Sequence, residues 1–247
     1  MREVDEELEV TEHLEELRKR IIWTLVVFIL FLVGSFVFVE EIYEWLIRDL
    51  DQKLVILGPS DILWVYVMIS GICAIAMTIP FAAFQIYRYI KPALNLKERK
   101  ATLSYIPVLF LLFLVGISFG YFIVFPMVLS FMEGLSANHF QEMYTTEKYF
   151  RFMMQMTLPF GLLFELPVVI LFLTTIGLLN PTHLIKARKV SYFVLVVVAV
   201  SVTPPDFISD FLVTIPLLLL YEISISLSKM VYKKKQKKER PDLKSVS

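Results

Sequence analysis

The sequence predicts an all-α membrane protein that crosses the bilayer several times, because of its composition and the spacing of its charges. Of the 247 residues 57% are hydrophobic, 14% are aromatic and 19% are charged, whereas an average soluble domain has about 25% charged residues. The charged residues are bunched, which leaves long charge-free runs, and the mean hydropathy is +0.69. These features exclude a disordered chain, a nucleic-acid-binding domain and an ordinary soluble enzyme.

Four spans are predicted from charge-free runs that reach or exceed the roughly 20 residues needed to cross a bilayer. A single acid, Glu165, interrupts the last of these runs. The predicted spans are about 21–39, 65–87, 103–130 and 150–178.

The apolar region after residue 189 predicts two further, shorter helices. It is divided by Thr203-Pro204-Pro205-Asp206, whose prolines and aspartate form a turn. Either two short spans cross here, at about 190–203 and 207–226, or one re-entrant hairpin enters and leaves on the same side; we favour two spans. Asp206 and Asp210 flank the turn, and Asp206 is expected to cap the helix that follows.

Basic residues indicate the orientation of the spans. Twenty of the 24 Lys and Arg residues fall before the first span, between the second and third, after the fourth, and after residue 228. Both termini are therefore expected in the cytoplasm. With two crossings in the last region, residues 1–228 are expected to form a single six-helix membrane domain and residues 229–247 a basic cytoplasmic tail.

The chain lacks the motifs of common enzyme sites. It contains no GxGxxG, GxxxxGK[ST], HExxH or GxSxG sequence. His13, His139 and His183 are far apart in sequence, and Cys73 is the single cysteine. We therefore predict a protein that is not an enzyme and that holds no cofactor and no metal.

The segment ahead of the first span is amphipathic. Leu14, Leu17 and Ile21 recur at intervals of three and four residues and form one apolar stripe of a helix. Glu16 lies on the solvated side. The ordinary interpretation, which spacing alone favours, is a helix on the membrane surface in which Glu16 pairs with Arg20. In the alternative, carboxylates beside the membrane form a site for a cationic ligand.

Two further acids stand out by their surroundings. Glu98 is the only acid in the basic segment 88–100, where it either neutralises the cations or combines with Glu16 to receive a guanidinium group. Glu165 lies within an apolar run, and an acid at the bilayer centre costs about 2.5–3.5 kcal/mol and is functional by default. The alternative for Glu165 is a protonated acid hydrogen-bonded to a carbonyl that Pro167 leaves unpaired.

Five motifs, in order along the chain, resemble the TatC family, the polytopic receptor subunit of the twin-arginine protein translocase. They are His13-Leu14-Glu15-Glu16-Leu17-Arg18-Lys19-Arg20, Pro92-Ala93-Leu94 with Glu98-Arg99, Gly120-Tyr121-Phe122-Ile123-Val124-Phe125-Pro126, Phe164-Glu165-Leu166-Pro167 and Thr203-Pro204-Pro205-Asp206. The resemblance implies six helices arranged as a concave cup in the bacterial cytoplasmic (inner) membrane. It also implies cytoplasmic termini and short fifth and sixth helices.

The resemblance further implies a function in protein transport. Members of the family bind signal peptides with consecutive arginines and assemble, within membrane lipid, with single-span TatA/TatB-type subunits. The receptor complexes form multimers and export folded proteins using the proton-motive force, without nucleic acid and without a cofactor.

Matching positions imply the site residues. The signal-peptide site would contain Glu16 and Glu98, supported by Arg18, Tyr89 and Pro92, and Glu165 would be the intramembrane polar residue. The outer turn and partner contact would contain Val200, Thr203, Asp206 and Asp210. Two positions depart from the family pattern: Tyr89 replaces a frequent Phe, and Asp210 stands where an uncharged amide is expected.

Two other functions stay open on the sequence alone. One is a proton- or ion-coupled small-molecule transporter that uses Glu165, and the other is a membrane scaffold without a ligand. The absence of an inverted repeat and the scarcity of other ionisable groups at membrane depth weigh against the transporter. Signal-peptide binding that is lost when RR becomes KK would distinguish the receptor from both.

Overall fold

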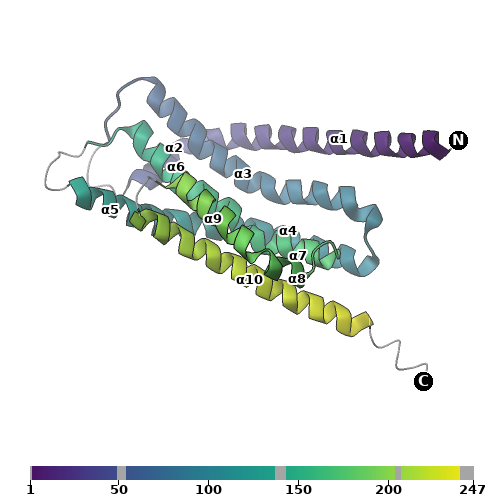
Figure 1. Cartoon of the computed structure of the whole chain (residues 1–247). Helices are drawn as coiled ribbons and strands as arrows, with labels where there is room; N and C mark the ends of the chain where they lie inside the picture. Colours follow the sequence, from purple (N-terminus) through teal and green to yellow (C-terminus); the bar gives the residue numbers. More distant parts are fainter. Residues whose placement is uncertain (1, 49–53, 137–142, 204–206, 240–247) are drawn as a thin grey trace. The chain divides into compact units, whose positions relative to one another are not determined.

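The computed structural model describes residues 2–48, 54–136, 143–203 and 207–239, and the regular structure of these ranges is helical apart from one isolated bridge between Val55 and Thr145 (Figure 1). The elements are α1 (Arg2–Val37), α2 (Val39–Ile47), α3 (Ser60–Ile90), the 3-10 turn η1 (Lys91–Ala93), α4 (Leu96–Phe119), the π-helical turn η2 (Gly120–Val124), α5 (Phe125–Ser136), α6 (Thr146–Leu163), α7 (Leu166–Thr175), α8 (Pro181–Lys186), α9 (Arg188–Val202) and α10 (Phe207–Glu239). The predicted all-α class is confirmed.

The chain folds as two compact units. The first comprises Met1–Phe110 with Thr145–Glu147, and the second comprises Leu111–Tyr144 with Lys148–Ser247.

In the first unit α1 packs along α3, and α2 also contacts α3. Val65 and Ile69, which are four residues apart and therefore share one face of α3, are almost fully buried. The turn ahead of α3 is closed by Asp61, whose carboxylate accepts the backbone N–H groups of Leu57 and Gly58 at 3.0 Å each. This hydrogen bonding satisfies backbone donors where the helix begins.

In the second unit the end of α4 crosses α6 at a distance that requires glycine. A Cβ added at Gly116 would lie 2.5 Å from the carbonyl oxygen of Phe160, and one at Gly120 would lie 2.8 Å from the Cα of Thr157. On the facing helix, a Cβ at Gly161 would lie 2.8 Å from Ile117 Cδ1. Small residues allow helix backbones to approach closely in membrane proteins, so these glycines set the contact of α4 and η2 with α6.

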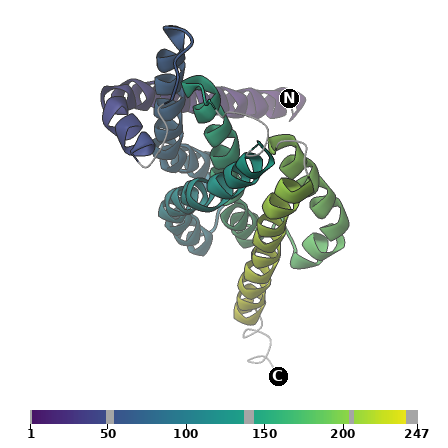
Figure 2. The ribbon, with the colours of Figure 1, turned by 90° about the vertical axis from the view of Figure 1, so that its left-hand side faces the viewer.

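The rest of the second unit is built around α10. Figures 1 and 2 show α9 beside α10, and α7 and α8 also contact it. The hydroxyls of Thr174 on α7 and Ser228 on α10 are 2.8 Å apart, and Tyr221 donates a hydrogen bond to the carbonyl of Leu184 at 2.9 Å. The side chains of α10 that are almost fully buried include the apolar residues Val213, Leu217 and Ile225 and the polar residues Ser224 and Ser228.

Within the part of the chain that the structure describes, five helical stretches are long and apolar enough to cross a membrane. They are His13–Val37, Ser60–Ala93, Glu98–Gly134, Thr146–Thr175 and Asp210–Lys234. Their number agrees with the predicted multi-pass class. A sixth crossing depends on α9, which has 15 residues and extends about 22 Å at 1.5 Å per residue.

The length of α10 differs from the expectation of a short sixth helix. The helix has 33 residues and runs past the apolar part into the basic tail. Residues 217–239 contain neither Gly nor Pro, and their Lys, Glu and Gln residues favour helix, so nothing ends the helix where the charges begin. The predicted shortness therefore applies to α9 alone.

Candidate functional site

The first candidate site lies where α1 and α3 pack together in the first unit. Arg20 donates two hydrogen bonds to Glu16 Oε1, from Nε at 3.1 Å and from Nη2, and a third from Nη1 to Gln85 Oε1 at 3.2 Å. The side chain of Arg20 is 15% exposed and that of Glu16 is 41% exposed. A largely buried guanidinium group thus orients a carboxylate that water and ligands can reach.

His13 connects the same site to the end of α3. Its ring stacks on Tyr89, with the ring centroids 4.3 Å apart and the planes inclined by 21°. His13 Nδ1 also lies 4.0 Å from Glu16 Oε2. The fold therefore brings the predicted residues Glu16 and Tyr89 together through His13.

Spacing alone does not single out His13 or Gln85 as members of this site. His13, Glu16 and Arg20 share one face of α1 because they are three and four residues apart, and this spacing is visible in the sequence. The contacts with Gln85 and Tyr89 bridge more than 60 residues of chain, and no local pattern indicates them.

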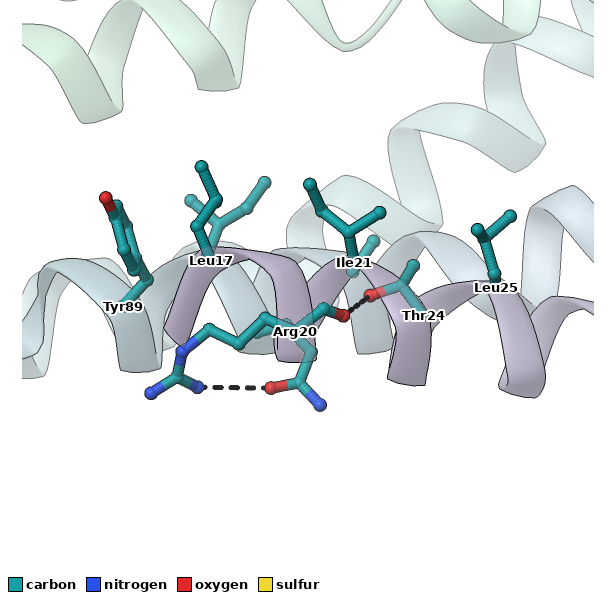
Figure 3. Close-up of a pocket in the computed structure, with 9 residues that line it drawn as sticks. Leu17, Arg20, Ile21, Thr24, Leu25 and Tyr89 are labelled. Atoms are coloured by element: carbon teal, nitrogen blue, oxygen red, sulfur yellow. Dashed lines mark hydrogen bonds between the residues drawn. The ribbon is translucent and has the colours of Figure 1, made fainter. Parts of the chain in front are cut away.

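An apolar groove of about 330 Å³ adjoins the Glu16 site. Figure 3 shows Leu17, Ile21 and Leu25 in a row along α1, on the side where the ring of Tyr89 lies, with the guanidinium group of Arg20 pointing the other way. Ala82 and Ile86 of α3 complete the apolar lining. A second hollow, of about 360 Å³, is more polar and is lined by Glu16, Lys19, Arg20, Trp23, Phe81, Gln85 and Arg88.

Of the other predicted members of the signal-peptide site, Pro92 and Glu98 follow α3 along the chain, and Arg18 lies on α1. Pro92 is exposed in η1, and Arg18 is exposed on α1. Glu98 is half-buried, and its Oε2 accepts the backbone N–H of Asn95 at 3.1 Å. Because Asn95 precedes α4 and Glu98 is its third residue, this contact is the carboxylate half of a capping box. The Asn95-x-x-Glu98 spacing is the sequence signal for this role.

Glu165 lies at the break between α6 and α7. The residue is half-buried, and neither carboxylate oxygen, both of which are inaccessible, has a hydrogen-bond partner among the described residues. Its backbone carbonyl accepts the N–H groups of Val168 and Val169 at 3.1 and 3.0 Å. Within the described ranges, the bond from a protonated Glu165 to a backbone carbonyl that the sequence suggests is not formed.

One short hydrogen bond joins Thr203, where the predicted outer turn begins, to Asp210 of α10. The hydroxyl of Thr203, which is buried, donates to Asp210 Oδ1 at 2.5 Å, and it also lies 3.0 Å from the carbonyl oxygen of Ala199. Val200 is exposed on α9. Asp206, with its predicted capping role, lies outside the described residues.

A polar cluster that sequence patterns do not reveal joins α9 to α10. Arg188 Nη2 donates to Glu222 Oε2 at 2.8 Å, and the hydroxyl of Tyr192 donates to Glu222 Oε1 at 2.5 Å. These contacts bridge 34 and 30 residues. These contacts hold the start of α9 against α10, and no local sequence spacing predicts them. Among the described residues, no group of three or more His, Cys, Asp or Glu side chains is arranged to hold a metal ion.

Comparison with known proteins relates most of the chain to a protein translocase. The family model described as Sec-independent protein translocase protein (TatC) matches residues 12–216. The Sec-independent protein translocase protein TatCd of Bacillus subtilis (strain 168) is 63% identical over 227 residues, which cover 92% of this chain and 94% of the relative. TatCy of the same organism is 41% identical over 240 residues, which cover 96% and 94% of the two chains.

Two crystal structures described as the twin arginine translocase receptor TatC share the fold. One has a TM-score of 0.76 at 31% identity and covers 89% of this chain and 99% of its own; the other, in DDM, has a TM-score of 0.78 at 32% identity and covers 87% and 99%. Sequence and fold agree over nearly the full length of the relatives. The chain therefore belongs to the TatC family of Sec-independent protein translocase proteins, which are multi-pass proteins of the bacterial cytoplasmic membrane.

Proposed function

We propose that this TatC-family protein is the receptor for twin-arginine signal peptides and that the two arginines bind at Glu16 and Glu98, with Arg18, Tyr89 and Pro92 in support. The related crystal structures are described as twin arginine translocase receptors. The proposal transfers that role to this chain.

The observation that carries the proposal is that Glu16 already binds a guanidinium group. Arg20 uses one carboxylate oxygen, Oε1, whereas Oε2 lies 4.0 Å from His13 Nδ1. Arginine is always charged, and its planar fork of donors matches a carboxylate in a way that lysine does not reproduce. An incoming arginine would therefore meet a carboxylate that the protein's own arginine has oriented.

The apolar groove beside Glu16 supports the same proposal. A signal peptide follows its arginines with an apolar stretch, and the groove lined by Leu17, Ile21 and Leu25 offers an apolar surface of suitable kind. Lys19 and Arg88 line the polar hollow beside it. These cations repel basic peptides that lack a paired carboxylate contact, which adds selectivity.

The partner site is proposed on α9 and the outer turn, at Val200, Thr203, Asp206 and Asp210. A single-span TatA/TatB-type helix would pack there against α9, whose apolar side chains are exposed. The exposed valines of this helix are Val190, Val194, Val196, Val197 and Val200. Such receptor complexes would assemble into multimers and export folded proteins with the proton-motive force.

Glu165 is proposed to draw polar groups or water to the second unit during transport. Its inaccessible carboxylate oxygens, which have no partner in the described ranges, support this role, because an unsatisfied buried acid costs free energy that folding alone does not recover. Membership of a protein translocase family speaks against the small-molecule transporter that Glu165 also suggests.

The experiment is a binding titration of the full chain in lipid nanodiscs with a fluorescent signal peptide carrying RR or KK. Glu16→Gln is expected to weaken binding of the RR peptide by about 10- to 150-fold, the range for a hydrogen bond to a charged group. The KK peptide should bind the parent protein and this variant equally weakly.

Glu15→Gln is the matched control. Glu15 is the preceding residue on α1, is exposed, and pairs with Lys19 at 3.1 Å on the protein itself. The Glu15→Gln variant should bind the RR peptide with the same affinity as the parent protein. Equal affinity for RR and KK peptides, or an equal loss in the Glu15 and Glu16 variants, would contradict the proposed site.

A further inference from the structure

One end of the second unit carries exposed lysines that the proposed receptor function does not use. We call this surface the basic rim, and its members are Lys186, Lys189, Lys229, Lys233 and Lys234. They belong to the end of α8, the first turn of α9 and the C-terminal half of α10. The charge distribution predicts that this end of the unit faces the cytoplasm.

The rim is held together by contacts between these three helices. Tyr221 of α10 donates to the carbonyl of Leu184 in α8 at 2.9 Å, and the side-chain amide of Asn180 lies 3.4 Å from the hydroxyl of Tyr232. Arg188 at the start of α9 binds Glu222 of α10. The lysines therefore belong to three helices that are held together by hydrogen bonds. Figure 1 shows α10 continuing beyond α8 toward the C-terminus.

The lysines of the rim lack acidic partners among the described residues. Glu222 is the nearest acid along α10 whose side chain the structure describes, and Arg188 and Tyr192 occupy both of its oxygens. The other described acid side chain of α8, α9 and α10 is Asp210, at the opposite end of α10. Five positive charges are thus concentrated on one side without an acidic partner among the side chains that the structure describes.

Large apolar side chains are exposed among these lysines. Leu178 is 72% exposed, Val190 is 67% exposed and Met230 is 61% exposed. Apolar groups interleaved with lysine are typical of protein surfaces that sit at the boundary between hydrocarbon and headgroups, because the lysine stem lies along the apolar layer while the ammonium group reaches the phosphates. An acidic soluble partner would not require the apolar members.

We infer that the basic rim is a binding surface for anionic phospholipid headgroups of the cytoplasmic leaflet. Each ammonium group near an anionic membrane surface adds roughly a fivefold preference for the charged lipid. The unbroken extension of α10 serves this purpose, since it carries Lys229, Lys233 and Lys234 past the apolar end of the span. Bound lipid would fix the start of α9 and the end of α10 at one depth in the membrane.

The test measures lipid retention by the purified full chain with native mass spectrometry. Equimolar phosphatidylglycerol and phosphatidylcholine are added in neutral detergent, and the ratio of the two bound lipids is recorded. The parent protein should retain phosphatidylglycerol preferentially. The Lys229→Gln, Lys233→Gln, Lys234→Gln triple variant should lower that ratio at least tenfold, and adding Lys186→Gln and Lys189→Gln should bring it to unity.

A matched triple variant keeps the charge change the same and moves it elsewhere. Lys91, Lys100 and Lys148 are exposed outside the rim, and their replacement by Gln should change the lipid ratio less than twofold. An equal fall of the lipid ratio in both triple variants would overturn the inference, because lysines outside the basic rim would then contribute as much to lipid binding as those within it. Displacement of the bound lipid by millimolar inorganic phosphate would also overturn it, in favour of a site for soluble anions, whereas unchanged retention supports it.

Discussion

Glu16, on α1, and Glu165, at the break between α6 and α7, are both half-buried acids, but their surroundings are opposite. Glu16 receives two hydrogen bonds from Arg20, and its side chain is 41% exposed. The oxygens of Glu165 are inaccessible and have no partner among the described residues. A carboxylate that a guanidinium group orients at the surface is ready to bind a second cation. A buried acid without a partner lowers the stability of the fold. Any benefit of Glu165 to the protein must therefore come from the polar groups or water that it attracts.

Glu98 and Asp210 fall between these extremes. Each accepts a hydrogen bond from a neutral donor: the backbone N–H of Asn95 at 3.1 Å for Glu98, and the hydroxyl of Thr203 at 2.5 Å for Asp210. Their carboxylates therefore combine a structural contact with a negative charge. Substitutions that remove the charge but keep the contact separate the two roles.

The largest expected effect is on signal-peptide binding by the Glu16→Gln, Glu98→Gln double variant. Each charge-assisted hydrogen bond is worth roughly 10- to 150-fold in affinity, so the double variant should bind the RR peptide more than about 100-fold more weakly than the parent. Fluorescence titration measures the change. Affinity equal to the parent's would remove both carboxylates from the proposed site, and circular dichroism should show that the fold is intact.

The second prediction concerns Glu165. Glu165→Leu removes an acid whose inaccessible oxygens have no hydrogen-bond partner among the described residues, so the thermal unfolding temperature of the purified protein should stay the same or rise. Export of a folded twin-arginine substrate should fall about tenfold or more, because a leucine recruits neither water nor polar groups. Glu165→Gln tests whether polarity suffices, and export at the parental rate by Glu165→Leu would show that the acid has no transport role.

The comparison also shows which features a single sequence reveals. The long apolar helices are evident because hydropathy and charge spacing are local properties. The helix α10 is longer than its apolar run because a helix ends where a breaker stands, and residues 217–239 contain none. The point in the sequence where charged residues begin therefore indicates the edge of the membrane, but it does not indicate where the helix ends.

Contacts between distant helices are the part that local patterns miss. The stacking of His13 on Tyr89 and the ion pair of Arg188 with Glu222 join segments far apart in the chain. Sequence spacing shows that Glu16 pairs with Arg20 on one helix, but the third contact of the guanidinium group, with Gln85, follows only from the packing of α1 on α3. The capping role of Glu98 can be predicted from the sequence, because Asn95 and Glu98 are only three residues apart. This role is an alternative to the interpretations of Glu98 that rest on its charge alone.

The third prediction tests the departure at Asp210. Asp210→Asn keeps an oxygen that can accept the hydroxyl of Thr203, but a neutral acceptor replaces a charged one. Hydrogen bonds to charged groups contribute about 1.5–3 kcal/mol and neutral ones about 0.5–1.5 kcal/mol, so the free energy of unfolding should fall by about 1 kcal/mol. Denaturant titration measures this. Co-purification of a single-span partner should be retained, and its loss would show that the partner needs the charge itself.

The smallest expected effect separates the two roles of Glu98 by comparing Glu98→Gln with Glu98→Ala. A glutamine at the third position of a helix can still accept the backbone N–H of Asn95, as in other capping boxes, whereas alanine cannot. The free energy of unfolding should therefore fall by about 0.5–1 kcal/mol in Glu98→Ala and by less in Glu98→Gln. Both variants lack the charge, so both should bind the RR peptide equally weakly. If Glu98→Gln binds the peptide like the parent while Glu98→Ala does not, Glu98 acts by holding the start of α4, and Glu16 is then the only carboxylate of the pair that meets the arginines.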